Sequence, residues 1–163
     1  MAQAKTLSPA ELDQVLNYVS TKKYALRDRA IVLTSFLGGL RVAEIASLTM
    51  GDVVNPDGSI KNEIRLSAAQ TKGKHPRTVF VSQRLQTELA NYLTTRHAKG
   101  ADIPFFHTDH RLRFSPNGLC VWFHQLYKNV GISGGSSHSG RKFFITTLAN
   151  KGIPEHYEWQ LKK

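Results

Sequence analysis

The sequence has 163 residues, 40% of them hydrophobic, and a formal net charge of +10 at pH 7. This length fits one domain with its own core, and the positive charge indicates a polyanionic partner, usually nucleic acid; a membrane surface or a role in solubility alone are the alternatives. Cys120 is the single cysteine, which excludes a disulfide framework and suits a reducing compartment such as the cytoplasm. No apolar run has the length of a membrane span or forms a signal-peptide core, so we expect neither.

The first part of the chain predicts helices. Ser8, Pro9 and Glu11 form a helix start, because serine caps, proline fits the first turn and the glutamate completes a capping box. Apolar residues at helical spacing follow. The expected helices cover residues 6–20, 25–37 and 41–48, and the second of them is largely buried and ends at a double glycine.

The middle and the end of the chain predict a hairpin and further helices. Residues 63–68 and 77–82 alternate like strands on either side of the loop AQTKGKHP. The remaining elements are helices over residues 83–100 and 115–131, a short extended segment over 103–108, and a helix that follows a Gly-Ser loop and ends near residue 150. The fold class is therefore α+β, mostly helical, with a small antiparallel sheet at one edge.

The loop GGSSHSGRKFF, residues 134–144, carries two cationic side chains into the last of these helices. Ser136 and Ser137 are suitable N-cap residues, so we expect His138 and Arg141 in the first turn, on one face. A helix N-terminus attracts anions, arginine offers a fork to two phosphate oxygens, and histidine can donate a hydrogen bond or carry a proton. The pattern predicts a phosphate receptor; two solvated cations are the alternative.

Two other segments carry cations in settings that call for a partner. Arg41 follows a double glycine and begins a mainly apolar helix, where its charge needs an anion. Glu44 is one such anion, and a weak surface pair between the two is the simpler explanation. At the expected hairpin tip, Lys72 and Lys74 flank a glycine, and a solvated turn is the alternative there.

These three segments resemble, in order and approximate spacing, the boxes of the tyrosine recombinases, the phage-integrase family. GGLRVAEIASL is similar to the first arginine box, TKGKHPRTVFVS to the lysine-bearing hairpin with its next strand, and HSGRKFFITTLANKG to the His-x-x-Arg box. The resemblance runs from about Ser8 to Gly152. It implies a single catalytic domain of the integrase type over residues 1–163, with a helical core and a small antiparallel sheet on one edge.

The resemblance implies site-specific DNA recombination or integration by transesterification at a phosphodiester. In this family a tyrosine attacks the phosphate, forms a 3′-phosphotyrosyl bond and frees a 5′-hydroxyl. Arg41 and Arg141 would clamp the non-bridging oxygens, on which negative charge gathers in the transition state. Two guanidiniums supply the charge that a divalent ion otherwise supplies, so we expect no metal and no other cofactor.

Other roles also follow from the resemblance. His138 would donate a hydrogen bond or carry a proton, and Lys72 would protonate the leaving 5′-oxygen. Lys74 takes that place if the register slips by two residues. Glu44 would orient one of the arginines.

Two further family features are not recognisable after the His-x-x-Arg box: a Leu-Gly-His segment and the nucleophilic tyrosine. Tyr157 is the only tyrosine after Arg141, and it is a poor nucleophile candidate because its surroundings do not resemble the family's. His156 and Trp159 lack the Leu-Gly lead-in. We therefore expect that the tyrosine segment and the N-terminal clamp domain are absent, and that the domain is cleavage-deficient unless a tyrosine comes from a partner chain.

Several basic side chains are expected to contact the DNA backbone, with strong salt dependence. They are Lys74, Arg77, Arg111, Arg113 and Lys142. His107 and His110 resemble metal ligands, but the chain has one cysteine and no fitting second pair of ligands, so no zinc site is expected. The expected partners are double-stranded DNA and other recombinase protomers on it, without a membrane or a small-molecule cofactor, in a bacterial cell or encoded by a phage or mobile element.

Three alternatives stay open. The chain could be an active recombinase that uses Tyr157, or a basic module that occupies recombination sites without catalysis. It could also be an unrelated basic helical protein, which would require the three cationic segments to lie apart in space.

Overall fold

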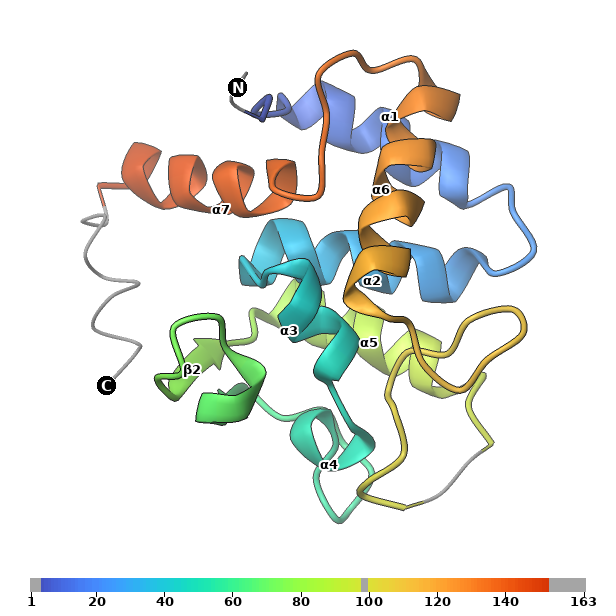
Figure 1. Cartoon of the computed structure of the whole chain (residues 1–163), viewed down its shortest axis with the longest axis vertical. Helices are drawn as coiled ribbons and strands as arrows, with labels where there is room; N and C mark the ends of the chain where they lie inside the picture. Colours follow the sequence, from blue (N-terminus) through green and yellow to red (C-terminus); the bar gives the residue numbers. More distant parts are fainter. Residues whose placement is uncertain (1–3, 98–99, 153–163) are drawn as a thin grey trace.

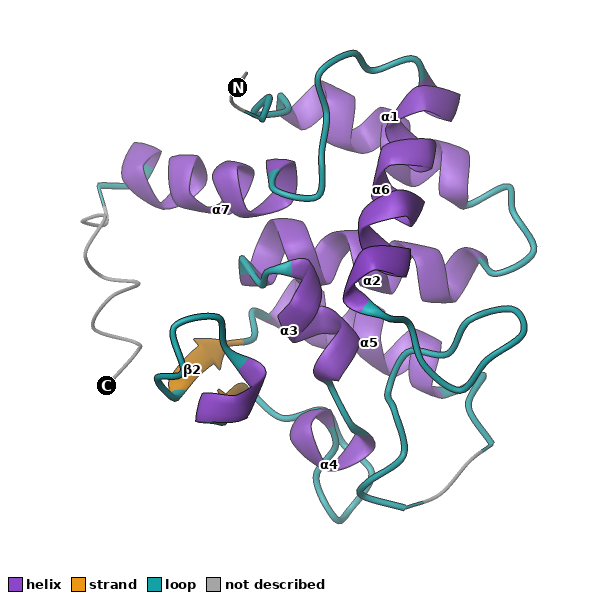
Figure 2. Cartoon of the chain, in the orientation of Figure 1, coloured by secondary structure: helices purple, strands orange, loops and turns teal. Residues whose placement is uncertain are grey.

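A computed structural model describes residues 4–97 and 100–152 and contains, in that part, seven α-helices, one 3₁₀ helix and a two-stranded sheet (Figures 1 and 2). The elements are α1 (Pro9–Val19), α2 (Ala25–Gly38), α3 (Val42–Ser47), α4 (Met50–Val53), β1 (Glu63–Leu66), η1 (Ala68–Gln70), β2 (Arg77–Phe80), α5 (Gln83–Leu93), α6 (Pro116–Val130) and α7 (Ser139–Asn150). The mostly helical fold with a small antiparallel sheet is confirmed.

Helix α1 begins as the sequence predicts. The Ser8 hydroxyl accepts the Glu11 backbone N–H at 3.1 Å, and the Glu11 carboxylate accepts the Ser8 N–H at 3.0 Å. This reciprocal pair satisfies two backbone donors that a helix start otherwise leaves open. The apolar face of α1 is buried against α2 and α6.

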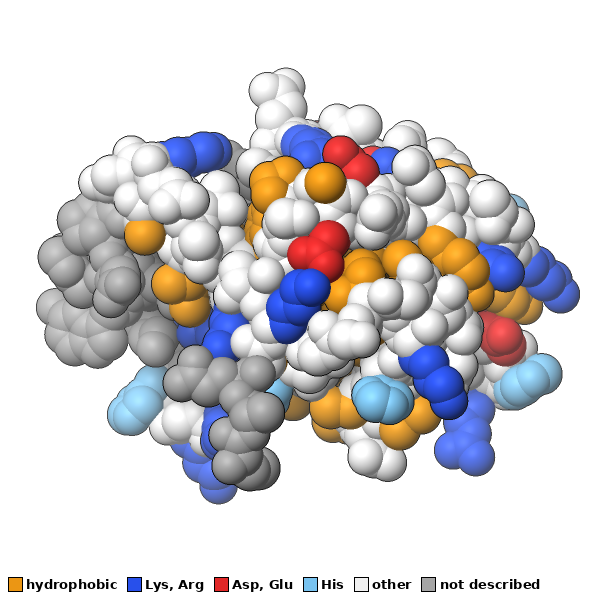
Figure 3. All heavy atoms as spheres, turned by 90° about the horizontal axis from the view of Figure 1, so that it is seen from above, with side chains coloured by type: hydrophobic (Ala, Val, Ile, Leu, Met, Phe, Trp, Pro, Cys, Tyr) orange, Lys and Arg blue, Asp and Glu red, His pale blue; other side chains and the backbone are white. Residues whose placement is uncertain are grey.

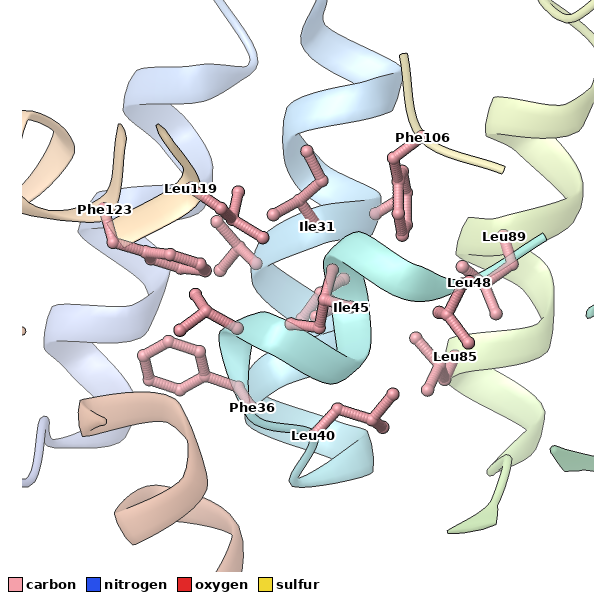
Figure 4. Close-up of a cluster of buried hydrophobic side chains, with 14 of the residues drawn as sticks. Ile31, Phe36, Leu40, Ile45, Leu48, Leu85, Leu89, Phe106, Leu119 and Phe123 are labelled. Atoms are coloured by element: carbon pink, nitrogen blue, oxygen red, sulfur yellow. The ribbon is translucent and has the colours of Figure 1, made fainter. Parts of the chain in front are cut away.

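Helix α2 is the centre of the core. It contacts α1, α3, α5 and α7, and its residues from Ala30 to Phe36 are all buried. Figure 4 shows Ile31 and Phe36 of α2 among apolar side chains of α3, α5 and α6. Because α2 is covered on several sides, its buried residues are spread around the helix and do not form the single stripe of a surface helix.

The sheet is shorter than the sequence predicts. β1 and β2 pair antiparallel, with Glu63 opposite Phe80 and Leu66 opposite Arg77. After β1, the Gln70 side chain accepts the Ser67 N–H at 2.8 Å, so the chain turns into η1 instead of extending the strand. The expected extended segment over residues 103–108 contributes only an isolated bridge at Pro104.

The helix boundaries also differ in three places. Helix α5 ends at Leu93, although the amphipathic pattern predicts helix to residue 100. Helix α4 was not predicted; it begins at a reciprocal pair of hydrogen bonds between Thr49 and Asp52. Helix α7 begins at Ser139, so His138 is its N-cap residue and does not lie within its first turn.

Candidate functional site

The start of α7 packs directly on the end of α2 (Figure 1). Gly39, the C-cap of α2, has φ +70°, and a Cβ built on it would overlap the Phe144 ring. A Cβ on Gly140 would overlap the Ser35 side chain. Glycine is needed at the first position for its left-handed backbone, and at the second because the two helices approach closely.

This close approach of α7 to α2 brings the His-x-x-Arg box next to the first arginine box. Arg141 Nη1 donates to the Gly39 carbonyl oxygen at 2.6 Å. Arg41 follows two residues later, so its Cα lies within about 7 Å of the Gly39 Cα. The side chains of Arg41 and Arg141 are both partly exposed. The two arginines that the sequence separates by a hundred residues therefore belong to one corner of the molecule.

Glu44 is held between Arg41 and a third arginine that the sequence analysis did not place there. Glu44 Oε1 accepts Arg77 Nη2 at 2.5 Å and the Arg41 backbone N–H at 2.8 Å. Glu44 Oε2 accepts Arg77 Nε at 3.1 Å and lies 3.7 Å from Arg41 Nη1. The expected Arg41–Glu44 pair exists, but the stronger partner of the carboxylate is Arg77.

This geometry corrects the expectation that Arg77 contacts DNA. Its side chain is 5% exposed and Glu44 is 1% exposed, so the pair is inside the protein. Arg77 shares the inward face of β2 with Val79, and the intervening Thr78 is more exposed. The period-two alternation of the strand was the signal that could have placed Arg77 inside.

His138 lies one helical turn before Arg141 and is exposed. Its backbone N–H donates to the Ser136 hydroxyl at 3.1 Å, and the Ser136 N–H donates to the Ser139 hydroxyl at 3.0 Å. Ser136 and Ser139 thus shape the loop, whereas the imidazole makes no capping bond. A spacing of three residues at a helix start places His138 and Arg141 on neighbouring positions.

Lys72 and Lys74 are exposed in the turn between η1 and β2, and Lys74 has φ +55°. The turn is fastened to α3 and α4, because Gln70 Nε2 donates to the Ser47 hydroxyl of α3 at 3.2 Å and to Asp52 Oδ2 of α4 at 3.0 Å. Sequence reasoning missed this role of Gln70, although Ser67 and Gln70 have capping-box spacing. The lysines are thus carried on a loop attached to the helix that Arg41 begins.

Arg111 and Arg113 lie on an exposed loop at the other end of α2. Arg27, near the start of α2, donates to the His107 carbonyl oxygen at 3.3 Å and to Asp109 Oδ1 at 2.7 Å, which anchors this loop. A helix of the length of α2 separates its ends by about 20 Å. The structure therefore does not bring Arg111 and Arg113 to the corner of Arg41 and Arg141.

Lys142 points to the N-terminal segment. Its Nζ donates to the Ala4 carbonyl oxygen at 2.9 Å, and the residue is partly buried. Lys5 continues the same attachment, since its backbone N–H donates to the Gly134 carbonyl oxygen at 3.0 Å. Lys142 thus fastens the start of α7 to the N-terminal segment, and its expected contact with DNA remains a prediction.

The tyrosines in the described part of the chain lie in the core or on other helices. Tyr92 and Tyr127 are buried, and burial raises the pKa of both phenols. Tyr24 precedes α2, at the opposite end of that helix from Gly39, and Tyr18 lies near the end of α1. Tyr157, His156 and Trp159 lie outside the described residues.

The described residues, 4–97 and 100–152, show neither the pattern of a metal-ligand group nor that of a membrane-spanning helix. No three His, Cys, Asp or Glu side chains in that part are grouped as metal ligands would be. His107 Nδ1 lies 2.8 Å from the Thr108 carbonyl oxygen, and the His110 N–H donates to the Thr108 hydroxyl at 3.2 Å. In the same part, every helix is too short or too polar to cross a bilayer.

Figure 3 shows basic side chains spread over one face of the molecule.

Solved structures share this fold. The chain matches the crystal structure of XerA recombinase with a TM-score of 0.80 at 23% identity, covering 99% of this chain and 55% of the other. It matches the Tn1549 transposon integrase in complex with circular intermediate DNA with a TM-score of 0.74 at 16% identity, covering 99% and 58%. The fold is therefore that of a tyrosine-recombinase catalytic domain.

The sequence itself gives the family. The sequence model of the Phage integrase family matches residues 5–157 of this chain, and the chain belongs to that family. The tyrosine recombinase XerA of Pyrococcus furiosus is 30% identical over 156 residues, 91% of this chain and 49% of that protein. Transposase A from transposon Tn554 of Staphylococcus aureus is 30% identical over 100 residues, 60% of this chain and 27% of that protein. The chain thus spans half or less of the length of these curated relatives.

Proposed function

We propose that this chain binds double-stranded DNA and receives one backbone phosphate between Arg41 and Arg141, as part of a site for site-specific recombination or integration. The observation that carries the proposal is the hydrogen bond from Arg141 to the Gly39 carbonyl oxygen, because it joins the two arginine boxes at one corner. The net charge of +10 supports a polyanionic partner.

The proposed chemistry is transesterification without a metal ion. A tyrosine hydroxyl oxygen forms a bond to phosphorus, the phosphorus–O5′ bond breaks, and the DNA 3′ end stays on the tyrosine. The guanidiniums of Arg41 and Arg141 stabilise the negative charge on the non-bridging oxygens as it builds up. His138 accepts the tyrosine proton or donates a hydrogen bond to the phosphate, and Lys72 donates the proton that the leaving 5′-oxygen takes up.

The relatives support DNA as the partner. The Tn1549 integrase was solved with circular intermediate DNA, and XerH site-specific recombinase was solved bound to its difH substrate. Both have the fold of this chain, with TM-scores of 0.74 and 0.69. We extend DNA binding to this chain by that likeness. Other recombinase protomers on the same DNA are a separate proposal, which rests on the resemblance to the tyrosine recombinases.

We further propose that the described residues supply the phosphate-binding part of the site and that the nucleophile comes from outside them. Tyr92 and Tyr127 are enclosed by the core, and Tyr24 is separated from the corner by the length of α2. Tyr157 belongs to this chain but lies outside the described residues, and its sequence surroundings do not resemble those of the family's nucleophile. We therefore propose that the chain alone binds DNA and is cleavage-deficient. A basic module that occupies recombination sites without catalysis remains the second candidate, and it is favoured by the same absence of a nearby tyrosine among the described residues.

The phosphate-binding proposal is tested with duplexes that contain one nick, ending in a 3′-phosphate or a 3′-hydroxyl. We expect the chain to bind the phosphorylated nick about tenfold more tightly, the order that one set of charge-assisted hydrogen bonds contributes. Arg41→Ala and Arg141→Ala should each remove this preference. Arg29→Ala, which changes the same charge on α2, should keep it. Retention of the preference in both corner variants would overturn the proposal.

The nucleophile is tested on a denaturing gel with a nicked half-site duplex. A covalent adduct that disappears in Tyr157→Phe would identify Tyr157 as the nucleophile and contradict the proposed deficiency. Absence of an adduct in the chain alone, with retained preference for the phosphorylated nick, is the expected result.

A further inference from the structure

The buried Arg77–Glu44 pair lies directly behind Arg41. We propose that Arg77 is a positioning residue that occupies Glu44, so that the guanidinium of Arg41 stays directed to DNA phosphate. This inference rests on the proposed function, because it assigns a role to Arg77 in the same site.

The geometry shows why Glu44 needs a second cation. The carboxylate is 1% exposed, and both its oxygens accept hydrogen bonds from Arg77. Arg41 approaches the same carboxylate only to 3.7 Å, beyond hydrogen-bond distance, while its backbone N–H is fixed at 2.8 Å. Arg77 thus makes the close ion pair, and Arg41 is held by its backbone.

The charges of the three groups give the consequence. Glu44 carries one negative charge, and Arg77 cancels it inside the protein. Arg41 is the outermost member, with 31% of its side chain exposed, and it retains the remaining positive charge. Without the charge of Arg77, a buried carboxylate would draw the Arg41 guanidinium inward, since an unpaired buried ion is unfavourable. Arg41 would then be lost to a phosphate.

The strand explains how Arg77 reaches Glu44. Arg77 is the first residue of β2 and pairs with Leu66 of β1, which points its side chain to the interior beside Val79. Lys72 precedes Arg77 by five residues in the same connection. The ion pair therefore attaches the β2 end of the lysine turn to α3, as Gln70 attaches its β1 end.

The inference is tested by the salt dependence of binding to a nicked duplex with a 3′-phosphate. Each phosphate contact contributes about 0.9 to the slope of log affinity against log salt concentration. We expect Arg41→Ala to lower the magnitude of the slope by about 0.9. Arg77→Met should lower it equally, although Arg77 touches no phosphate, and Arg41→Ala with Arg77→Met should lower it no further.

A rescue separates this role from a merely structural one. In the double variant Glu44→Gln with Arg77→Met, the buried charge is gone, so Arg41 should be released and the slope should return to that of the wild type. Arg77→Lys keeps the charge and should stay near the wild type. If Arg77→Met does not fold, Arg77→Gln carries the same prediction, because it keeps a hydrogen-bond donor and loses the charge.

The matched control is Arg29→Met. Arg29 binds Glu88 in the same two-bond manner, at 2.7 and 3.3 Å, between α2 and α5. Its loss should leave the slope unchanged.

Two results would overturn the inference. A slope lowered by about 1.8 in the Arg41–Arg77 double variant would show that Arg77 binds phosphate itself. An unchanged slope in a folded Arg77→Met protein would show that the pair serves stability alone. An unchanged slope in Arg41→Ala is a separate outcome, and it would overturn the proposed function and this inference with it.

Discussion

Arg141 and Gly39 are 102 positions apart in the chain, yet the Arg141 guanidinium donates to the Gly39 carbonyl oxygen at 2.6 Å. Gly39 closes α2, and Arg41 opens α3 two residues later. A single hydrogen bond thus connects the start of α7 to the turn that precedes Arg41. The proposed phosphate site depends on this contact between helices.

Gly140→Ala should weaken that contact. Alanine ordinarily favours a helix over glycine by about 1 kcal/mol, but the new Cβ would overlap Ser35 of α2. We expect the free energy of unfolding to fall by about 1–3 kcal/mol, measured by urea denaturation. Ser35→Gly in the same chain should recover most of the loss. Gly73→Ala, whose nearest neighbouring atom is at 3.6 Å, is the control; a Gly140→Ala protein as stable as the wild type would contradict the packing.

Arg77→Met should destabilise the fold strongly. Removing one member of a buried ion pair typically costs about 3–5 kcal/mol. Arg41, drawn toward Glu44, should offset only part of this cost, because its guanidinium comes from the partly exposed side. The double variant Glu44→Gln with Arg77→Met removes both charges, so it should be more stable than Arg77→Met alone. Chemical denaturation of the three proteins measures this, and equal stability of the single and double variants would refute a buried charge at Glu44.

Replacing Arg111 and Arg113 together by alanine should weaken DNA binding without touching the phosphate corner. The two exposed side chains lie at the far end of α2 from Arg41 and Arg141. We expect the magnitude of the slope of log affinity against log salt concentration to decrease by up to about 1.8. The preference for a phosphorylated nick should remain. Lysine at both positions should keep the slope of the wild type, because contact with the phosphates of the DNA backbone requires only the positive charge. Loss of the nick preference in the alanine variant would show that this loop belongs to the phosphate site.

The start of α1 should contribute stability that depends on pH. Hydrogen bonds from the Lys5 ammonium and from the Ser8 N–H hold the pKa of Glu11 below its usual value. A folded-state pKa below the unfolded one stabilises the fold above the unfolded pKa of about 4.3, and the contribution disappears as the pH falls through the folded value. Glu11→Gln should therefore cost about 0.5 kcal/mol at pH 7 and nothing near pH 2, by denaturation at both pH values. A difference of equal size at both would be inconsistent with this assignment.

Local patterns predicted much of the fold. The capping pair of Ser8 and Glu11 marked α1, and the double glycine marked the end of α2, because both signals act within one helical turn. The short helix α4 was missed, although Thr49 and Asp52 have the spacing of a capping pair. Its four residues are too few for an apolar period to show.

The residue types of the candidate site could be predicted from the sequence, but the contacts between its distant segments could not. The boxes marked Arg41, Glu44 and Arg141, but their meeting depends on how α7 packs on α2, which no local pattern specifies. Arg77 was expected on the surface because it is charged and follows a basic turn. Its true place depends on the register of β2, where it alternates with Thr78 and shares the inward face with Val79.

The most direct test of a single phosphate receptor is a titration with inorganic phosphate at constant ionic strength, followed by the NMR signals of the Arg41 and Arg141 side-chain Nε–H groups and the His138 ring. The account predicts that all three signals move along one binding curve with one dissociation constant, and that chloride at the same ionic strength moves none of them. Signals of the two arginines that follow different curves, or that stay fixed, would contradict it.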